Sequence, residues 1–324
     1  MLTRRCITLA AIALAATLPL GAAAQAFPPT RPISLLVGFA PGGAADAAAR
    51  LIAKKLSENI GQSVVVENKG GAGGNIAHQQ AAAGPADGTL LLLGSVGPLT
   101  IAPHMGKLPY DPFKDLAPVS GAVFFPNLLV VHPSSGIRNM QDFVAAAKKA
   151  PNSVSYASTG RGSASHLAGE LFAARTGTEM LHVPYKGGAP AMNDLLAGRF
   201  TGYFSAPPTS LPQVEAGKLV PLATTGPTRP AYMPNIPTVA ESGLPGFEAL
   251  NWYAFVASSK VPAPILDRYN TEIVKVLNDP GVRDALTKLG LTPHPTTRPE
   301  LLDFMQKEST KWAQIIRDRK ITAE

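Results

Sequence analysis

The chain has 324 residues and a formal net charge of +7, a length sufficient for one large or two ordinary domains with a buried core. Its single cysteine excludes a disulfide framework and a multi-thiolate metal site, and no basic run interleaved with aromatic residues points to nucleic acid as a partner. The 30 glycines and 31 prolines stay below the proportion typical of disordered chains and indicate a folded protein with many sharp turns.

Residues 1–26 have the features of a secretory signal peptide. Arg4 and Arg5 precede an apolar run that is too short for a membrane-spanning helix and ends in a string of small residues. Alanines at the required spacing fit cleavage after Ala24 or Ala26. We therefore predict export, by the general secretory or the twin-arginine route, and a soluble mature chain.

Beyond this segment, short apolar runs alternate with stretches of helical spacing. A strand at 33–37, a glycine turn, a helix at about 44–60 and a strand at 63–66 form a βαβ unit, whose crossover should be right-handed. The pattern continues with helices at about 75–83, 139–150, 165–176 and 189–197, and with strands at 89–93, 128–132, 153–157, 181–183 and 200–204. This alternation predicts an α/β architecture with mostly parallel sheets.

The composition changes near Thr225, where prolines crowd the segment up to Phe247. One aromatic strand follows at 251–256. Three helices are then expected to begin near Pro264, Asp279 and Arg298, because each position carries a helix start signal.

The first strand-to-helix turn is a candidate anion site. Gly38 to Gly43 has the glycine spacing of a phosphate-binding loop, but Ala44 and Ala45 stand where that loop needs Lys and Ser or Thr, which excludes nucleotide hydrolysis. A glycine turn at a helix N-terminus still favours an anion, whereas the alternative is a tight connection without a ligand. Asp46 either complements the helix dipole or holds the loop in shape.

A second turn of this kind spans 158–166, between a strand and a helix. Its small and hydroxyl residues allow a ligand to approach backbone amides, and it lacks the flanking glycines of a nucleophile elbow. His166 falls in the first turn of the helix, where a structural role is the more common one. The glycine run at 70–74 has Ile76 in place of the last glycine of a dinucleotide fingerprint, and the six histidines show no metal spacing. No local motif indicates an enzyme, a metal or a cofactor.

Several motifs together resemble the periplasmic receptors of tripartite tricarboxylate transporters, also called Bug-type solute-binding proteins. They run in order over essentially the whole mature chain: Phe39-Ala40-Pro41-Gly42-Gly43 with Asp46, Val64-Val65-Val66-Glu67-Asn68, Gly71-Ala72-Gly73-Gly74, Tyr156-Ala157-Ser158, His182-Val183-Pro184-Tyr185-Lys186-Gly187, Asp194-Leu195-Leu196-Ala197-Gly198 and Gly246-Phe247-Glu248 with Trp252.

The resemblance implies a monomeric, two-lobed Venus-flytrap fold of the type II periplasmic-binding class, each lobe a mostly parallel sheet flanked by helices. One lobe would comprise 27–119 and 226–324 and the other 120–225. A ligand carboxylate would be held between the lobes by backbone amides and water at the two turns. The predicted ligand-binding residues are Phe39, Ala40, Pro41, Gly42, Gly43, Asp46, Ser95, Ser158, Thr159, Gly160, Gly162, Ser163, His166 and Ser205.

The resemblance further implies a periplasmic receptor, without catalytic activity, that delivers a small organic carboxylate to a small and a large membrane permease subunit. Ser205 stands where many family members carry an acidic residue, so we expect a mono- or dicarboxylate without an ammonium group. A sensor that presents its ligand to a membrane kinase and, with less support, a secreted α/β hydrolase are the alternatives. Gly42→Val and Gly162→Val are expected to weaken binding far more than stability.

Overall fold

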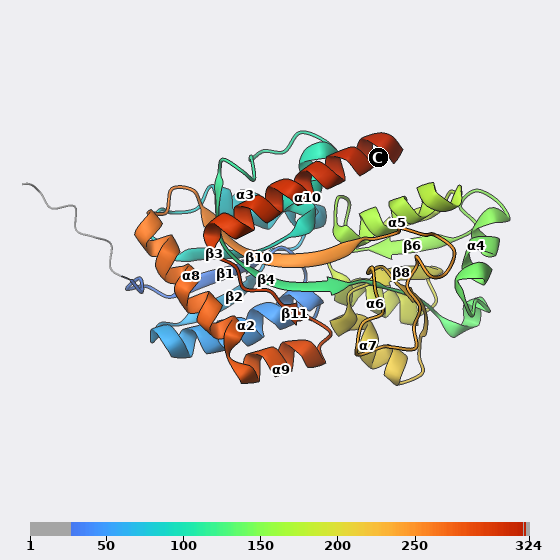
Figure 1. Cartoon of the computed structure of the whole chain (residues 1–324), viewed down its shortest axis with the longest axis horizontal. Helices are drawn as coiled ribbons and strands as arrows, with labels where there is room; N and C mark the ends of the chain where they lie inside the picture. The colour runs from blue at the N-terminus through green and yellow to red at the C-terminus, as the bar shows by residue number, and fades with distance from the viewer. Residues whose placement is uncertain (1–26, 320, 322–324) are drawn as a thin grey trace, which may run out of the picture.

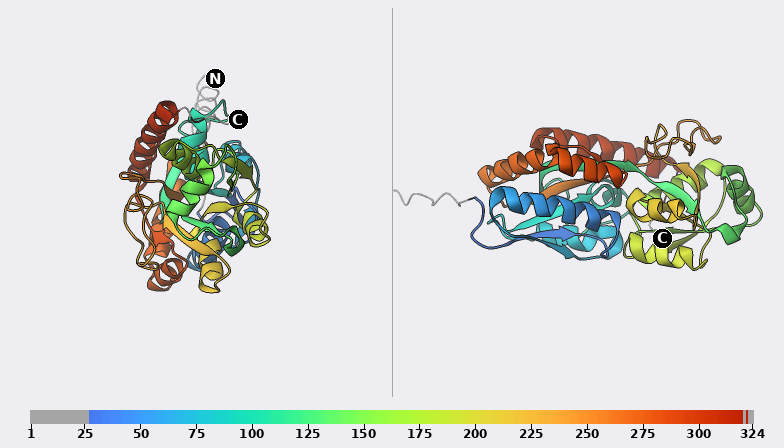
Figure 2. Two further views of the ribbon diagram at one scale, coloured as in Figure 1. Left: turned by 90° about the vertical axis from the view of Figure 1, so that its right-hand side faces the viewer. Right: turned by 90° about the horizontal axis from the view of Figure 1, so that it is seen from below.

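Two β-sheets, one at the centre of each lobe, organise residues 27–319 and 321, which this computed structural model describes (Figure 1). The lobes lie side by side along the long axis of the molecule, as the view from below also shows (Figure 2). The signal peptide predicted at residues 1–26 lies outside the described residues.

The first lobe holds a six-stranded sheet in the order β11-β4-β10-β3-β1-β2. Its strands are β1 (Ile33–Val37), β2 (Val64–Asn68), β3 (Leu90–Ser95), β4 (Leu116–Pro126), β10 (Leu250–Ser258) and β11 (Thr292–Pro293). Its helices are α2 (Ala44–Ile60), α3 (Asn75–Ala82), α8 (Ala263–Asn278), α9 (Pro280–Lys288) and α10 (Arg298–Arg319), with the short turns η2 (Ala72–Gly74), η3 (Gly97–Ile101) and η4 (Ala102–His104).

The second lobe holds a five-stranded sheet in the order β7-β6-β8-β5-β9. Its strands are β5 (Leu128–Val131), β6 (Ser155–Ser158), β7 (Leu181–Pro184), β8 (Gly202–Ser205) and β9 (Val220–Thr224). Its helices are α4 (Met140–Lys148), α5 (Ala164–Thr176), α6 (Gly188–Leu196) and α7 (Pro207–Glu215), with the short turn η5 (Pro133–Ser135).

Both sheets are mixed, whereas the sequence predicted mostly parallel ones. β1 is parallel to β2 and β3, and β6 is parallel to β7 and β8, as the βαβ pattern requires. β5 and β10, the strands that bring the chain in from the other lobe, are antiparallel to both of their neighbours. No helical crossover links them to those neighbours, so nothing forces a parallel arrangement.

The sequence analysis missed β4, β9 and α7. Helix α7 begins with two prolines, which need no backbone N–H partner at that position, and it carries Pro212 in its interior. The long strand β4 contains Pro118 and Gly121, and its register with β10 shifts twice. The lobe boundary expected at Val119 falls inside β4, which remains in the first sheet up to Pro126, so the chain changes sheets at Asn127.

Thr225 joins the two places where the chain passes between the lobes. Its hydroxyl donates to the carbonyl of Ala249 at 2.7 Å and accepts from the backbone N–H of Asn127 at 2.9 Å. Its own backbone N–H donates to the Asn127 carbonyl at 2.9 Å, and its carbonyl accepts from the Ala249 N–H at 2.9 Å. One fully buried side chain therefore fixes both crossings relative to each other.

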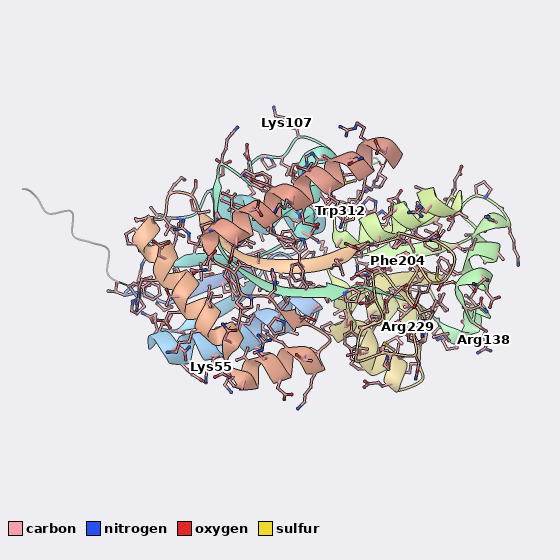
Figure 3. All side chains as sticks on the ribbon, viewed as in Figure 1. Lys55, Lys107, Arg138, Phe204, Arg229 and Trp312 are labelled. Atoms are coloured by element: carbon pink, nitrogen blue, oxygen red, sulfur yellow. The ribbon has the colours of Figure 1, made fainter. Side chains whose placement is uncertain are left out.

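The C-terminal helix α10 spans both lobes. It packs against β4 and η3 of the first lobe and against α5 of the second. Figure 3 shows the buried Trp312 on the part of this helix that reaches over the second lobe. Next to it, the ammonium group of Lys311 lies 2.9 Å from the Glu248 carboxylate, which tethers the helix to the segment that leads into β10.

We expect Thr225→Val to lower the free energy of unfolding by about 2–4 kcal/mol, because it leaves a buried N–H and a buried carbonyl without their partner. The neighbouring Thr224 supplies a matched control. Its side chain is equally buried, but its hydroxyl has no hydrogen-bond partner, so Thr224→Val should change stability by less than about 0.5 kcal/mol. Urea denaturation of both variants measures the difference, and equal losses would contradict this role of Thr225.

Candidate functional site

A small interlobe cavity is lined by residues of both lobes and of both chain crossings. It lies at the ends of the strands of both sheets, and Phe204 of β8, labelled in Figure 3, forms part of its wall. None of the described residues that line the cavity carries a charge. Any charge on a bound molecule would therefore be balanced by backbone dipoles and hydroxyl groups.

Two helices from opposite lobes begin at this cavity. A β-carbon on Gly43, the N-cap of α2, would lie 3.5 Å from the backbone nitrogen of Gly188, the first residue of α6. No side chain caps either helix. The first backbone N–H groups of a helix lack partners within it and carry the positive end of its dipole, so the two helix starts form a place for an anion.

Two further helices point their N-termini at the same cavity but have fewer donors to offer. The hydroxyl of Ser163 caps α5 by accepting from the His166 N–H, although Ala164 and Ser165 still line the cavity. Helix α7 begins with Pro207 and Pro208, which have no N–H. The donors that remain for a ligand thus come mainly from α2 and α6.

Three buried polar atoms without hydrogen-bond partners belong to residues that line the cavity: Ser95 Oγ, Asn127 Nδ2 and Asn251 Oδ1. We call these residues the polar trio. Their exposed fractions are 3%, 1% and 9%. Since buried polar groups in proteins are nearly always hydrogen-bonded, these atoms point to a bound molecule or to water in the cavity.

Hydrogen bonds to side chains of its own lobe fix the shape of the loop Phe39–Gly43. The Asp46 carboxylate accepts from the Gly42 N–H and from Arg50 Nε, each at 3.0 Å. Burial alone would raise the pKa of Asp46, but the hydrogen bonds from Arg50 and Gly42 together hold this pKa below its usual value. Asn68 also fixes the loop, because its amide donates to the Phe39 carbonyl at 3.1 Å. The charge of Asp46 is therefore used within its own lobe.

The second loop meets the first lobe through glycines. A β-carbon on Gly97 would lie 2.5 Å from the carbonyl oxygen of Gly162, and one on Gly160 would lie 2.7 Å from the nitrogen of Gly73. The backbone of Ala40 donates to the Lys186 carbonyl at 2.9 Å across the same cleft. The lobes are thus in direct backbone contact, and the structure is a closed one.

The backbone angles of two glycines in these loops add a cost in stability to the substitutions considered from the sequence. Gly42 and Gly162 have φ angles of +80° and +75°, which L side chains rarely adopt, so valine at either position would strain the backbone. A β-carbon at Gly42 would face Ala189 and one at Gly162 would face Ala102, each in the opposite lobe. Both substitutions would therefore reduce stability and disturb lobe closure.

Behind the second loop lie the buried His166 and the half-buried His182. His182 Nε2 is 2.6 Å from the hydroxyl of Ser158, which in turn accepts from the Gly160 N–H at 3.0 Å. His166 Nδ1 accepts from the Gly162 N–H at 3.2 Å, and the rings of His166 and His182 lie 4.1 Å apart. Burial, then the neighbouring His182 and Arg161, lower the pKa of His166 to about 3. Burial, then the nearby Arg161, also lower the pKa of His182 to about 4, so both imidazoles are neutral at pH 7 and shape the loop.

The predicted residues thus fall into several groups. Phe39, Gly43, Ser95 and Thr159 line the cavity. Ala40, Gly160 and Gly162 contact the opposite lobe, Gly42 and Asp46 fix the first loop, and Pro41 is exposed. Ser158, Ser163 and His166 lie in the buried network of the second loop, and the Ser205 hydroxyl bonds to Thr209 Oγ1 at 2.8 Å beneath α7.

The sequence analysis did not select the start of α6, the aromatic wall of Tyr203, Phe204 and Tyr253, or the amides of Asn127 and Asn251. Gly187-Gly188 follows a predicted strand and precedes a predicted helix, so it carried the same signal as the two turns that were chosen. Burial raises the pKa of Tyr203 and of Tyr253, so both side chains contribute neutral hydroxyls. The two asparagines meet only because the chain crosses between the lobes twice.

The sequence profile of the tripartite tricarboxylate transporter family receptors matches residues 48–321. The chain belongs to this family. BugT of Bordetella pertussis is 37% identical over 292 residues, which are 90% of each chain. A structure of R. palustris Rpa4515 with adipate is 35% identical with a TM-score of 0.87, over 91% of this chain and 99% of that one. MatC from Rhodopseudomonas palustris with bound malate is 29% identical with a TM-score of 0.84, over 89% and 99%.

These comparisons confirm the predicted family, its non-enzymatic solute-binding character and the two-lobed periplasmic-binding fold. Among residues 27–319 and 321 there is no cluster of three His, Cys, Asp or Glu side chains that could hold a metal ion. Within the same residues, no helix of the receptor has the length and apolar character needed to cross a membrane.

Gly97→Ala should hold the lobes apart, since the added methyl group would collide with Gly162 of the second lobe while the φ of Gly97 does not disfavour alanine. We expect a larger radius of gyration by small-angle scattering, and ligand binding weakened at least about tenfold, the equivalent of 1.4 kcal/mol. Gly106→Ala is the control, because Gly106 is an exposed position in the same lobe where an added β-carbon would meet no other atom within 4 Å. Identical scattering from the two variants would contradict this role of Gly97.

His78 makes the stability of the receptor depend on pH. It is fully buried, its Nδ1 lies 2.9 Å from the Gly74 carbonyl, and its Nε2 accepts from the Ser95 N–H. Burial lowers its pKa to about 4, so below about pH 6.5 the unfolded chain takes up a proton that the folded chain does not. Stability is therefore present above that pH and is lost as the pH falls toward 4.

We expect His78→Gln to lower the stability at pH 7 but to flatten its pH dependence. Between about pH 6 and 4.5 the slope of the unfolding free energy should fall by up to about 1.4 kcal/mol per pH unit. Denaturant unfolding at several pH values measures both quantities. An unchanged slope would mean that His78 is protonated in the folded receptor.

Proposed function

We propose that this chain is a periplasmic solute-binding receptor that captures a small organic carboxylate between its lobes and delivers it to a membrane transporter of the tripartite tricarboxylate type. The pair of uncapped helix starts, α2 from one lobe and α6 from the other, carries the proposal. Adipate and malate in the structures of two relatives support the class of ligand.

A carboxylate suits this place because its two oxygens can accept hydrogen bonds from both lobes at once. Each helix start is equivalent to about half a positive charge, so the two together match one negative charge. A ligand that bonds to both lobes binds the closed form better than the open one, and only this difference in affinity can drive closure. Binding and closure are thus the same event.

The uncharged lining also limits which ligands the cavity can bind. An ammonium group would be buried without an acidic partner, because the carboxylate of Asp46 is already bound by Arg50 and Gly42. The ligand should therefore carry no ammonium group. Export by the signal peptide would release the receptor in the periplasm as a monomer, where the closed form would dock on the small and large membrane subunits.

Thermal unfolding with a panel of carboxylates tests the proposal. A ligand at 100 times its dissociation constant stabilises by about 2.7 kcal/mol, which raises the melting temperature of a protein of this size by about 5–10 °C. The panel includes adipate, malate, benzoate, hexanoate and glutamate, each beside its methyl ester. We expect shifts from acids without an ammonium group and none from the esters. Equal shifts from acids and esters, or no shift at all, would overturn the proposal.

A further inference from the structure

We propose that the polar trio binds a neutral polar group of the ligand, so that the receptor selects a monocarboxylate whose other end carries a hydroxyl or a carboxamide. The inference rests on the proposed function, because the carboxylate end is assigned to the starts of α2 and α6. Neither the second carboxylate of a diacid nor a bare alkyl end satisfies the trio.

The order of the strands places the trio beyond the carboxylate end. The loop into α2 follows β1, Ser95 ends the adjacent strand β3, Asn251 lies on the next strand β10, and Asn127 follows β4, the strand after that. Neighbouring strands are about 5 Å apart, so Ser95 lies about one strand spacing and Asn251 about two from the loop into α2. A chain of about four to six carbons covers these separations.

The two amides present both a donor and an acceptor. Asn251 Nδ2 donates to Asn127 Oδ1 at 3.5 Å, which leaves Asn127 Nδ2 and Asn251 Oδ1 without partners. Turning both amides over exchanges these roles but again leaves one donor and one acceptor free. A hydroxyl or a carboxamide can satisfy both groups, whereas a carboxylate only accepts and would face the free amide oxygen.

The charge available in the cavity suffices for one carboxylate. None of the described residues in the lining is charged, and the two uncapped helix starts together supply about one positive charge, which the first carboxylate uses. A second carboxylate at the trio would be buried without a cation, which is unfavourable even when hydrogen bonds remain. The aromatic side chains of Phe39, Tyr203 and Tyr253 line the cavity with the trio and suit the apolar middle of such a ligand.

Two ligand series that differ only in the terminal group test the inference by calorimetry. The six-carbon series is adipate, adipamate, 6-hydroxyhexanoate and hexanoate, and the four-carbon series is succinate, succinamate, 4-hydroxybutanoate and butanoate. In at least one series we expect the amide or the hydroxy acid to bind about tenfold to a hundredfold more tightly than both the diacid and the alkyl acid. A diacid or an alkyl acid as the tightest ligand in both series would overturn the inference.

Variants then show whether the polar trio recognises the terminal group of the ligand. Ser95→Ala removes a hydroxyl that has no partner, so the fold should be kept, while the preference for the amide or hydroxy acid over the alkyl acid falls about tenfold. Asn251→Asp should reduce the binding of all neutral-ended acids and favour 6-aminohexanoate instead. Asn278→Asp, the same change at an exposed position at the end of α8, is the control and should leave all affinities unchanged.

The outcomes separate the two proposals. If acids bind and their methyl esters do not, but Ser95→Ala and Asn251→Asp change every affinity in a series by the same factor, the carboxylate site stands and the role of the trio is overturned. If the acids bind no better than their esters, the proposed function fails, and the inference fails with it.

Discussion

The meeting of two helix starts across the cleft is the contact on which the rest of the site depends. A β-carbon on Gly43 would lie 3.5 Å from the Gly188 nitrogen, one on Gly187 would lie 2.8 Å from the Ala40 nitrogen, and the Ala40 N–H bonds to the Lys186 carbonyl beside them. A side chain at Gly187 would hold the lobes apart, which explains why α6 begins at a glycine turn. Lobe closure and the proposed anion site therefore depend on the same two loops.

This design separates affinity from selectivity. Backbone N–H groups at the helix starts are present whatever side chains surround them, so the proposed anion site does not depend on a particular lysine or arginine. The remaining wall consists of neutral side chains, and single changes there alter which ligand fits without disturbing the anion site. The bound diacids of two relatives, adipate and malate, are consistent with one scaffold that serves different carboxylates.

Much of the fold could be predicted from the sequence, because each βαβ unit carries a local sequence pattern. The strand at Ile33–Val37 and the helix that follows from Ala44 were predicted with their observed bounds, since the glycine turn between them marks both ends. The strand β4 and the helix α7 could not be predicted, because proline in each contradicts the local pattern and only the tertiary setting tolerates it.

The residues of the site, too, could be predicted only where they belong to a local sequence pattern. Phe39, Gly43 and Thr159 belong to turns with a recognisable spacing, and they line the cavity. Asn127 and Asn251 lie 124 positions apart in the chain, and no local pattern joins them. They come together because Thr225 fixes the two chain crossings side by side, which places both amides at the segments that connect the lobes. A group bound there would contact both connecting segments, so its chemistry would bear on the fit of the ligand and on how the two lobes are held together.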